Sequence, residues 1–228
     1  MTRPLVLLRP QPGNDRSATQ ARERGLSVVQ VPLFEIVAAP MTNGPDGPFE
    51  AVLVTSTNGV RFGARVLAHF ADLPIYTVGE ATAQAIRALG HGNVIVGGGD
   101  AASTVPMIAA AGHHSILHLC GADVRPFDPS GIEFTRHVVY EAALRADAEV
   151  RPSLDAIAGG VIAVHSPRAG SRLADLIQPE RRARFHLLAI SPAAASASGD
   201  GWSGMAISAR PDDTALLTLA ESLCNCGD

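Results

Sequence analysis

The chain has 228 residues, a formal net charge of −4 and 46% hydrophobic residues, which suits one large domain or two small lobes. Aromatic residues make up only 4%, so a buried core must consist mainly of Val, Leu, Ile and Ala. All 18 basic residues are arginines, and they form no run that could follow a phosphate backbone, which argues against nucleic acid as a partner. No apolar stretch approaches the roughly 18 residues of a membrane span.

The N-terminal residues do not resemble an export signal. The first apolar run, residues 5–8, ends at Arg9 and Pro10 and is too short for the apolar region of a signal peptide. Three cysteines without an export signal favour a reducing cytoplasm, in which Cys224 and Cys226 stay unpaired.

Short apolar runs alternate with amphipathic segments along the whole chain. The runs are mostly continuous, as expected of strands buried on both faces of a parallel sheet. Helical spacing of apolar residues is clear at 62–70, 173–177 and 216–223, and residues 211–214 are typical of a helix start. This alternation predicts a doubly wound α/β fold. The expected strands cover residues 5–8, 28–31, 51–54, 75–78, 94–96, 116–119, 161–164 and 187–190.

Three pairs of segments resemble each other in the same order. The segment around Ser56 resembles that around Ser166, 110 residues later. Residues 76–83 resemble 188–195 at an offset of 112, and residues 25–35 resemble 131–141 at an offset of 106. Such an ordered set at nearly constant offset indicates an internal repeat.

The repeat does not predict two simple tandem lobes. The strand-like segment 33–40 leads into a Gly/Pro-rich stretch, and its partner 137–144 leads into the polar stretch 145–152, which suggests two extended connections. We therefore expect a first lobe of residues 1–38 plus 145–228 and an inserted lobe of residues 41–136. The linker strands would be 33–40 and 137–144, with the chemistry in the cleft between the lobes.

Hydroxyl groups follow several of the expected strands. Residues 55–58 and 166–168 lie beyond the carboxyl ends of strands, where α/β sheets bind ligands and helix N-termini hold anions. The simpler interpretation is that Ser and Thr here are ordinary N-caps. Residues 79–82 and 191–192 allow the same two interpretations.

Several other chemistries lack their motifs. The sequence has no G-x-G-x-x-G after a strand, no lysine for a P-loop and no G-x-S-x-G elbow. His114, His118 and Cys120 would share one strand face, but packing is the more common fate of such a run, since no further ligand pair has metal spacing. Tyr140 is one of only two tyrosines, and its phenol is protonated at neutral pH, so it can donate a hydrogen bond or act as a weak acid.

Placed in order, these segments resemble the uroporphyrinogen-III synthases. The likeness rests on LLRP at 7–10, TSTNGV at 55–60, YTVGEATA at 76–83, Tyr140 and SPR at 166–168, and it extends over nearly the whole chain. It implies an α/β fold of two flavodoxin-like lobes with parallel sheets, the second inserted into the first and joined to it by two crossing strands. It also implies a lyase of haem biosynthesis that cyclises linear hydroxymethylbilane, with loss of water and inversion of the last pyrrole ring. No metal or organic cofactor is implied.

The resemblance also implies roles for particular residues. The phenol of Tyr140 would assist departure of the substrate's hydroxyl group as a general acid. Because the protein is acidic, backbone amides and hydroxyls should outnumber arginines in holding the substrate carboxylates. Many relatives carry threonines where residues 193–195 are alanines here, so only Ser191 is carried over from that turn. The expected substrate-binding residues are Arg9, Thr55, Ser56, Thr57, Asn58, Gly79, Thr82, Gly121, Arg125, Ser166, Arg168 and Ser191.

We expect a cytoplasmic monomer, with a transient handover of substrate from the preceding bilane-forming enzyme and no membrane or nucleic-acid partner. The alternative is a cytoplasmic two-lobed binding or sensor protein for an anionic small molecule. The missing phosphate motifs disfavour a third interpretation, a nucleotide-dependent α/β enzyme.

Overall fold

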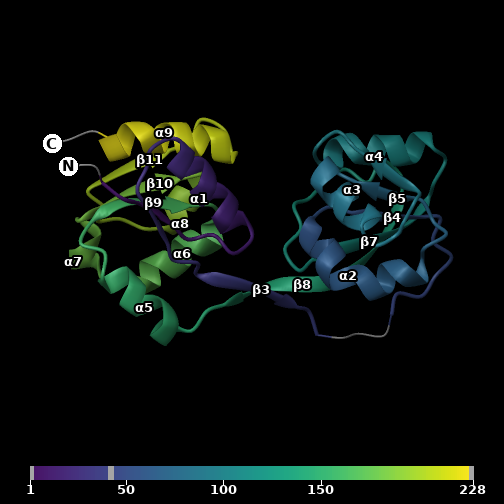
Figure 1. Cartoon of the computed structure of the whole chain (residues 1–228), viewed down its shortest axis with the longest axis horizontal. Helices are drawn as coiled ribbons and strands as arrows, with labels where there is room; N and C mark the ends of the chain where they lie inside the picture. Colours follow the sequence, from purple (N-terminus) through teal and green to yellow (C-terminus); the bar gives the residue numbers. More distant parts are fainter. Residues whose placement is uncertain (1–2, 41–43, 226–228) are drawn as a thin grey trace. The chain divides into compact units, whose positions relative to one another are not determined.

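A computed structural model describes residues 3–40 and 44–225, so Cys226 lies outside the described residues. The chain divides into two compact units. Unit 1 joins the residues up to Glu35 with those from Ala143 onward, and unit 2 is Ile36–Ala142 (Figure 1). Unit 2 is thus inserted into the sequence of unit 1, and the two division points fall within β3 (Phe34–Ala38) and β8 (Glu133–Leu144). The predicted α/β fold is confirmed.

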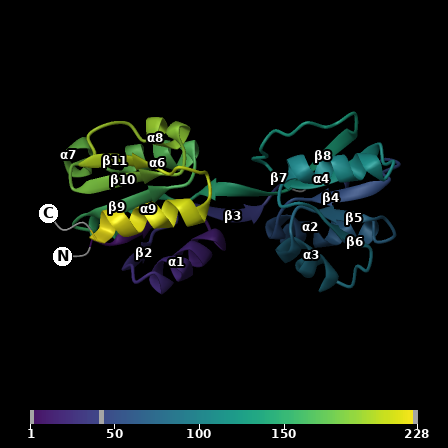
Figure 2. The ribbon, with the colours of Figure 1, turned by 90° about the horizontal axis from the view of Figure 1, so that it is seen from above.

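Unit 1 is a five-stranded parallel sheet with helices on both faces. The strand order is β11-β10-β9-β1-β2, and α1 and α9 cover one face while α6 and α8 cover the other (Figure 2). Its strands are β1 (Leu5–Leu7), β2 (Val28–Gln30), β9 (Gly160–Val164), β10 (Phe185–Ala189) and β11 (Gly204–Ile207). Its helices are α1 (Gly13–Glu23), α5 (Asp147–Asp155), α6 (Pro167–Leu176), α7 (Pro179–Arg182), α8 (Pro192–Ala197) and α9 (Asp213–Asn225).

Unit 2 contains a six-stranded sheet in the order β3-β8-β7-β4-β5-β6, whose neighbours from β8 to β6 are parallel. The remaining strands are β4 (Ala51–Val54), β5 (Ile75–Thr77), β6 (Val94–Val96) and β7 (Ser115–Gly121). The helices α2 (Thr57–His69) and α3 (Glu80–Arg87) pack on one face, and α4 (Ala101–Ala110) packs on the other.

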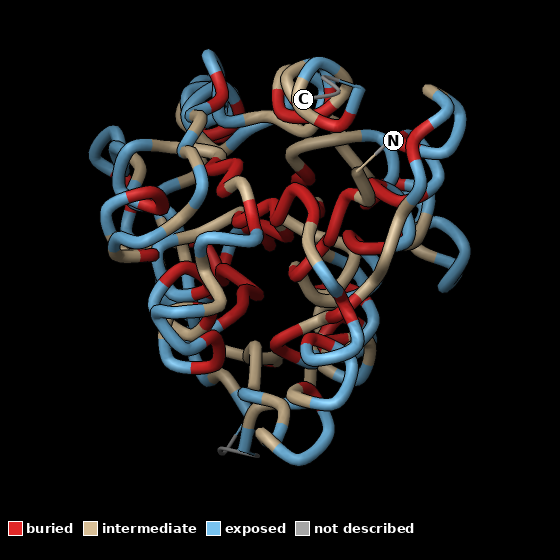
Figure 3. Tube along the Cα trace, turned by 90° about the vertical axis from the view of Figure 1, so that its left-hand side faces the viewer, coloured by how far each residue is buried: buried red, intermediate tan, exposed pale blue. Residues whose placement is uncertain are grey.

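The central strands are buried on both faces, as their continuous apolar runs predict. Every residue of β4 and β9 is buried, and so are the strands β1, β5 and β10, except for His186. Figure 3 shows buried segments along the inner parts of the trace. The core is mainly aliphatic, as the low aromatic content requires. Helices must therefore cover both faces of each sheet, and the carboxyl ends of the strands are the usual place for a ligand in such a fold.

The sequence repeat has a structural counterpart. The spatial order β8-β7-β4-β5-β6 in unit 2 matches β2-β1-β9-β10-β11 in unit 1, position by position. Ser56 and Ser166 both cap a helix in nearly the same backbone conformation, with φ of −154° and −163°. Each unit therefore takes two neighbouring strands from one repeat and three from the other, which explains why the repeat boundary is not a domain boundary.

Two elements lie where the sequence analysis predicts no helix or strand. Residues 145–152, described from the sequence only as a polar stretch, contain most of α5, because Asp147 and Glu149 suit a helical first turn and Asp147 binds Arg151 and Arg172. The strand β11 was not expected at all. It lies at a sheet edge, where its residues alternate between half-buried and exposed, so it produces no continuous apolar run.

His118 is a buried titratable group inside unit 2. Its side chain is fully buried on β7 beside the rings of Phe127 and Phe134, at centroid distances of 5.7 and 6.3 Å. Within the described part of the chain, neither ring nitrogen has a hydrogen-bond partner. Burial, helped by the charge of Arg136, lowers the pKa of His118 to about 4. The histidine is therefore a neutral core residue at pH 7.

This burial predicts a pH-dependent stability. Between pH 6.5 and about 4 the unfolded chain gains a proton at residue 118 that the folded chain does not, so the free energy of unfolding falls as the pH falls. The loss should approach about 3 kcal/mol near pH 4. His118→Leu should remove it, and urea unfolding at a series of pH values measures the difference. The exposed control His114→Leu should behave as wild type; equal pH dependence in wild type and His118→Leu would contradict the prediction.

Candidate active site

In each unit the expected residues gather at the carboxyl ends of the parallel strands. In unit 2, Thr55, Ser56, Thr57 and Asn58 follow β4, Gly79 and Thr82 follow β5, Gly121 ends β7, and Arg125 lies exposed in the next loop. In unit 1, Arg9 follows β1, Ser166 and Arg168 follow β9, and Ser191 follows β10. Because neighbouring strands are parallel, these ends form one edge of each sheet.

Three serines cap the helices that begin at these edges. The Oγ atoms of Ser56, Ser166 and Ser191 accept hydrogen bonds from the amides three residues later, at 3.1, 3.2 and 3.3 Å. The N-cap interpretation is thus correct for all three. Capping leaves other first-turn amides without a helical partner, so the turns can still offer N–H groups to an anion.

The side chains beside Ser56 have no internal partners. Thr55, Thr57 and Asn58 are half-buried, and nothing in residues 3–40 and 44–225 hydrogen-bonds to their side chains. Thr82, in contrast, is buried with 5% exposure and its amide donates to the Gly79 carbonyl, so here it packs α3 against the sheet.

Tyr140 lies at this edge of unit 2. Its Oη atom is 3.0 Å from Ser56 Oγ, and its ring stacks on Phe62 of α2, with centroids 6.1 Å apart and an interplanar angle of 29°. Ser56 Oγ already accepts from the Gly59 amide. The Ser56 hydroxyl can therefore donate to Tyr140 Oη, which leaves the phenol proton free for a third group. A chain of hydrogen bonds then runs from the N-terminus of α2 to the phenol, and each bond polarises the next.

Gly121 and an irregularity in the sheet set the position of the Tyr140 ring. Cys120 pairs with Val138 but Gly121 pairs with Tyr140, so β8 carries one extra residue at this point. A Cβ atom on Gly121 would lie 2.7 Å from the Tyr140 ring, closer than any side chain could tolerate. The sequence suggests Gly121 as a substrate contact; in the structure the missing side chain of Gly121 makes room for the tyrosine.

The equivalent position in unit 1 carries no hydroxyl group. At the repeat offset of 106 residues, Phe34 corresponds to Tyr140. The Arg168 guanidinium lies 4.7 Å from the Phe34 ring centroid, a cation–π contact. The two units therefore share the capped turn, but only unit 2 adds a phenolic acid to it.

Arg9 is held within unit 1. Its Nη1 atom donates to both carboxylate oxygens of Asp213, at 2.7 and 2.5 Å, and lies 3.1 Å from Ser17 Oγ. His165 Nε2 is 3.3 Å from the same carboxylate. Burial opposes ionisation of Asp213, but bonds to His165 and Ser17 and the charge of Arg9 together hold its pKa well below the usual range. The positive charge of Arg9 is thus balanced inside the unit.

Sequence reasoning had no signal for this cluster. Asp213 stood out only as part of a helix start, and His165 only as the neighbour of Ser166. The cluster joins the ends of β1 and β9 to the starts of α1 and α9, which are distant in sequence. As for the suggested metal face, His118 and Cys120 are buried while His114 is exposed, and no group of three or more metal-ligating side chains occurs among the described residues.

The comparisons with known proteins find uroporphyrinogen-III synthases. The family model described as uroporphyrinogen-III synthase HemD matches residues 15–218. The solved uroporphyrinogen-III synthetase of Helicobacter pylori 26695 is similar at a TM-score of 0.64 and 20% identity, covering 97% of this chain and 99% of that one. A Thermus thermophilus uroporphyrinogen III synthase mutant has a TM-score of 0.48 at 14% identity, covering 96% and 98%. No curated protein matches significantly.

The contact between Gly121 and Tyr140 predicts the effect of a single methyl group. Gly121→Ala must displace the ring or the strand, and such overpacking should lower the free energy of unfolding by about 1–3 kcal/mol. Gly92→Ala is the matched control, because its added Cβ meets no atom within 4 Å. Urea unfolding of both variants checks this, and equal stabilities would show that the ring is not fixed by Gly121.

Proposed function

The chain belongs to the uroporphyrinogen-III synthase family, and from this premise we propose how its residues carry out the reaction. The activity is that of a cyclising lyase of haem biosynthesis. Hydroxymethylbilane loses water and closes to uroporphyrinogen III with its last pyrrole ring inverted. The proposal concerns the acid that assists departure of the hydroxyl group and the groups that hold the carboxylates.

We propose that Tyr140 is the general acid. The observation that carries this is the hydrogen-bond chain from the Gly59 amide through Ser56 Oγ to Tyr140 Oη. When Ser56 donates to the phenol oxygen, the phenol proton is directed away from the protein, toward a leaving hydroxyl. As that hydroxyl departs and takes the proton, negative charge develops on Tyr140. Ser56 and the N-terminus of α2 then stabilise this charge.

Holding the substrate in a reactive conformation supplies the remaining rate enhancement. The bilane is electron-rich and closes by itself to the uninverted isomer, so the enzyme must direct attack to the substituted carbon of the last ring. This gives a strained spiro intermediate, which fragments and recloses. Holding the reacting atoms in place can supply several kcal/mol without a strong base. Rigid strand ends suit this task, because their backbone is fixed by the sheet.

Amides and hydroxyls are the proposed carboxylate ligands. Thr55, Thr57 and Asn58 have no internal hydrogen-bond partner in the described chain, and the capped turns at Ser166 and Ser191 repeat the same geometry. The charge of Arg9, by contrast, is already balanced by Asp213. The other two arginines suggested by sequence, Arg125 and Arg168, are exposed, and the Arg168 guanidinium contacts the Phe34 ring. This supports a site in which neutral donors outnumber arginines.

Further features of the enzyme belong to the proposal. We infer a cofactor-free monomer of the cytoplasm that takes its substrate by transient handover from the bilane-forming enzyme. Two findings are consistent with it: Cys120 and Cys224 are unpaired and buried, and no described helix is long and apolar enough to cross a membrane. Nothing in the fold favours the alternative of a binding or sensor protein.

Product analysis tests the function directly. Dialysed protein that sediments as one 23.6 kDa chain, supplied with fresh hydroxymethylbilane and no added metal or cofactor, should yield mainly the type III isomer after oxidation and chromatography. A protein-free sample gives the type I isomer. If the protein also yields type I alone, the synthase function is wrong.

The two tyrosines provide a matched pair of variants. Tyr140→Phe removes the acid and should slow turnover about a hundredfold, at the lower end of general-acid effects, without loss of folding. Tyr76→Phe removes a hydroxyl from a buried tyrosine of the same unit and should leave turnover near wild type. Steady-state rates of both variants decide this: equal rates in Tyr140→Phe and wild type would remove Tyr140 from the mechanism.

A further inference from the structure

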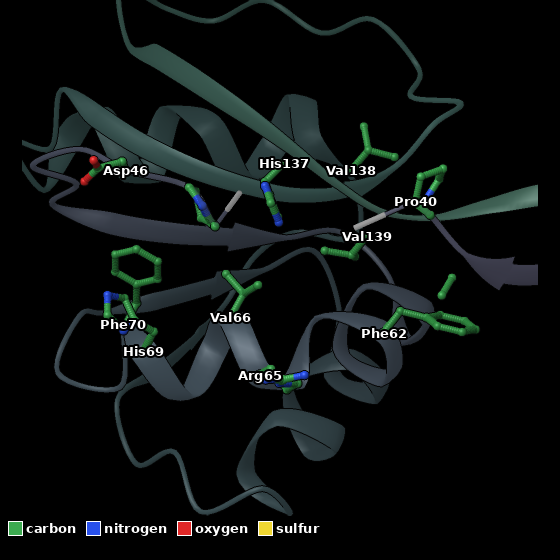
Figure 4. A pocket seen from close by; sticks show the side chains of 14 residues that line it. Pro40, Asp46, Phe62, Arg65, Val66, His69, Phe70, His137, Val138 and Val139 are labelled. Carbon is green, nitrogen blue, oxygen red and sulfur yellow. The ribbon is translucent and has the colours of Figure 1, made fainter. Parts of the chain in front are cut away.

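Unit 2 contains a pocket of about 610 Å³ that none of the proposed catalytic or substrate-binding residues lines. Its walls come from α2, from β8, from the end of β3 and from residues 44–46. In Figure 4, Val66 of α2 and His137 and Val139 of β8 point into the same space. The volume lies in the range of pockets that hold small organic molecules.

The lining combines an apolar wall with basic groups. Phe62, Val66 and Phe70 from α2 and Val139 from β8 supply the apolar surface. Arg65, His69 and His137 also line the pocket, against one carboxylate, Asp46. Burial lowers the pKa of His137, so at pH 7 it is a neutral hydrogen-bonding group rather than a cation.

Arg65 is the unusual feature of this wall. It is exposed on α2, and in the described part of the chain it forms no ion pair, hydrogen bond or ring contact. The neighbouring Arg61, in contrast, lies over the ring of Phe62 at 4.9 Å. A guanidinium without a partner beside an apolar pocket is arranged to pair with an anionic group on a bound molecule.

We propose that this pocket binds an amphiphilic organic anion, with its ring system against Val66 and Phe70 and its acidic group on Arg65. Apolar walls with a few placed polar groups are the general form of such sites. The pocket also reaches Phe62, on which Tyr140 stacks at 6.1 Å. If Tyr140 is the acid of the proposed function, a bound anion contacts the residue that supports it, and the pocket is a place from which turnover can be regulated.

The test uses anilinonaphthalene sulfonate, a fluorescent amphiphilic anion, and the native protein without substrate. Wild type should bind one equivalent saturably. Arg65→Gln should weaken binding about tenfold, the loss of one ion pair. Phenylnaphthylamine, the same ring system without the sulfonate, should bind wild type and Arg65→Gln equally. Val66→Trp puts a large ring where the ligand's ring system is proposed to lie and should abolish binding, whereas Ala68→Trp, on the exposed face of α2, should not.

The experiment tests the location of the site and the chemical class of the ligand separately. If Arg65→Gln binds the sulfonate as wild type does, the anionic class is wrong. If wild type shows no saturable binding, or Val66→Trp and Ala68→Trp bind alike, the pocket is not the site. Arg65→Gln alters an exposed side chain, so the test remains decisive even if Val66→Trp fails to fold. No turnover is measured, so a failed synthase assay would leave these outcomes unaffected.

Discussion

Burial of both faces of the central strands is the constraint on which the rest of the molecule depends. The strands β4 and β9 are buried throughout, so helices must cover each sheet on both faces. Because these strands are parallel to their neighbours, each connection must also bring the chain back to the same end of the sheet. The carboxyl ends of the strands are then where the backbone amides of each sheet can meet a ligand. The chain meets this constraint twice, with one strand order realised in both units.

The two units have matching sheets and capped turns, so one oxygen atom in an aromatic side chain is enough to distinguish them chemically. The capped turns at Ser56 and Ser166 have nearly the same backbone geometry, but the adjacent aromatic residue is Tyr140 in unit 2 and Phe34 in unit 1. Only the first can donate a proton. The extra residue in β8 and the missing side chain of Gly121 then place that phenol within 3.0 Å of Ser56. A local irregularity in an otherwise regular sheet thus creates the proposed acid site.

The helix α2 serves three purposes at once. Its N-terminus supports the Ser56–Tyr140 pair, one face packs into the core through Val60 and Leu67, and another lines the pocket through Val66. Phe62 connects these functions, because it touches both Tyr140 and the pocket.

The sequence by itself determined the α/β class, most strands and the residues that end them, because continuous apolar runs and N-cap serines are local signals. The internal repeat was also evident from the sequence. The sequence missed β11, whose edge position leaves no continuous apolar run, and it missed α5, whose first turn depends on Arg172 from a distant segment. Tertiary structure alone decided that Arg9 is paired with Asp213, that Gly121 makes room for Tyr140, and that Thr82 is buried. Each of these depends on contacts between residues far apart in the chain, which no local pattern encodes.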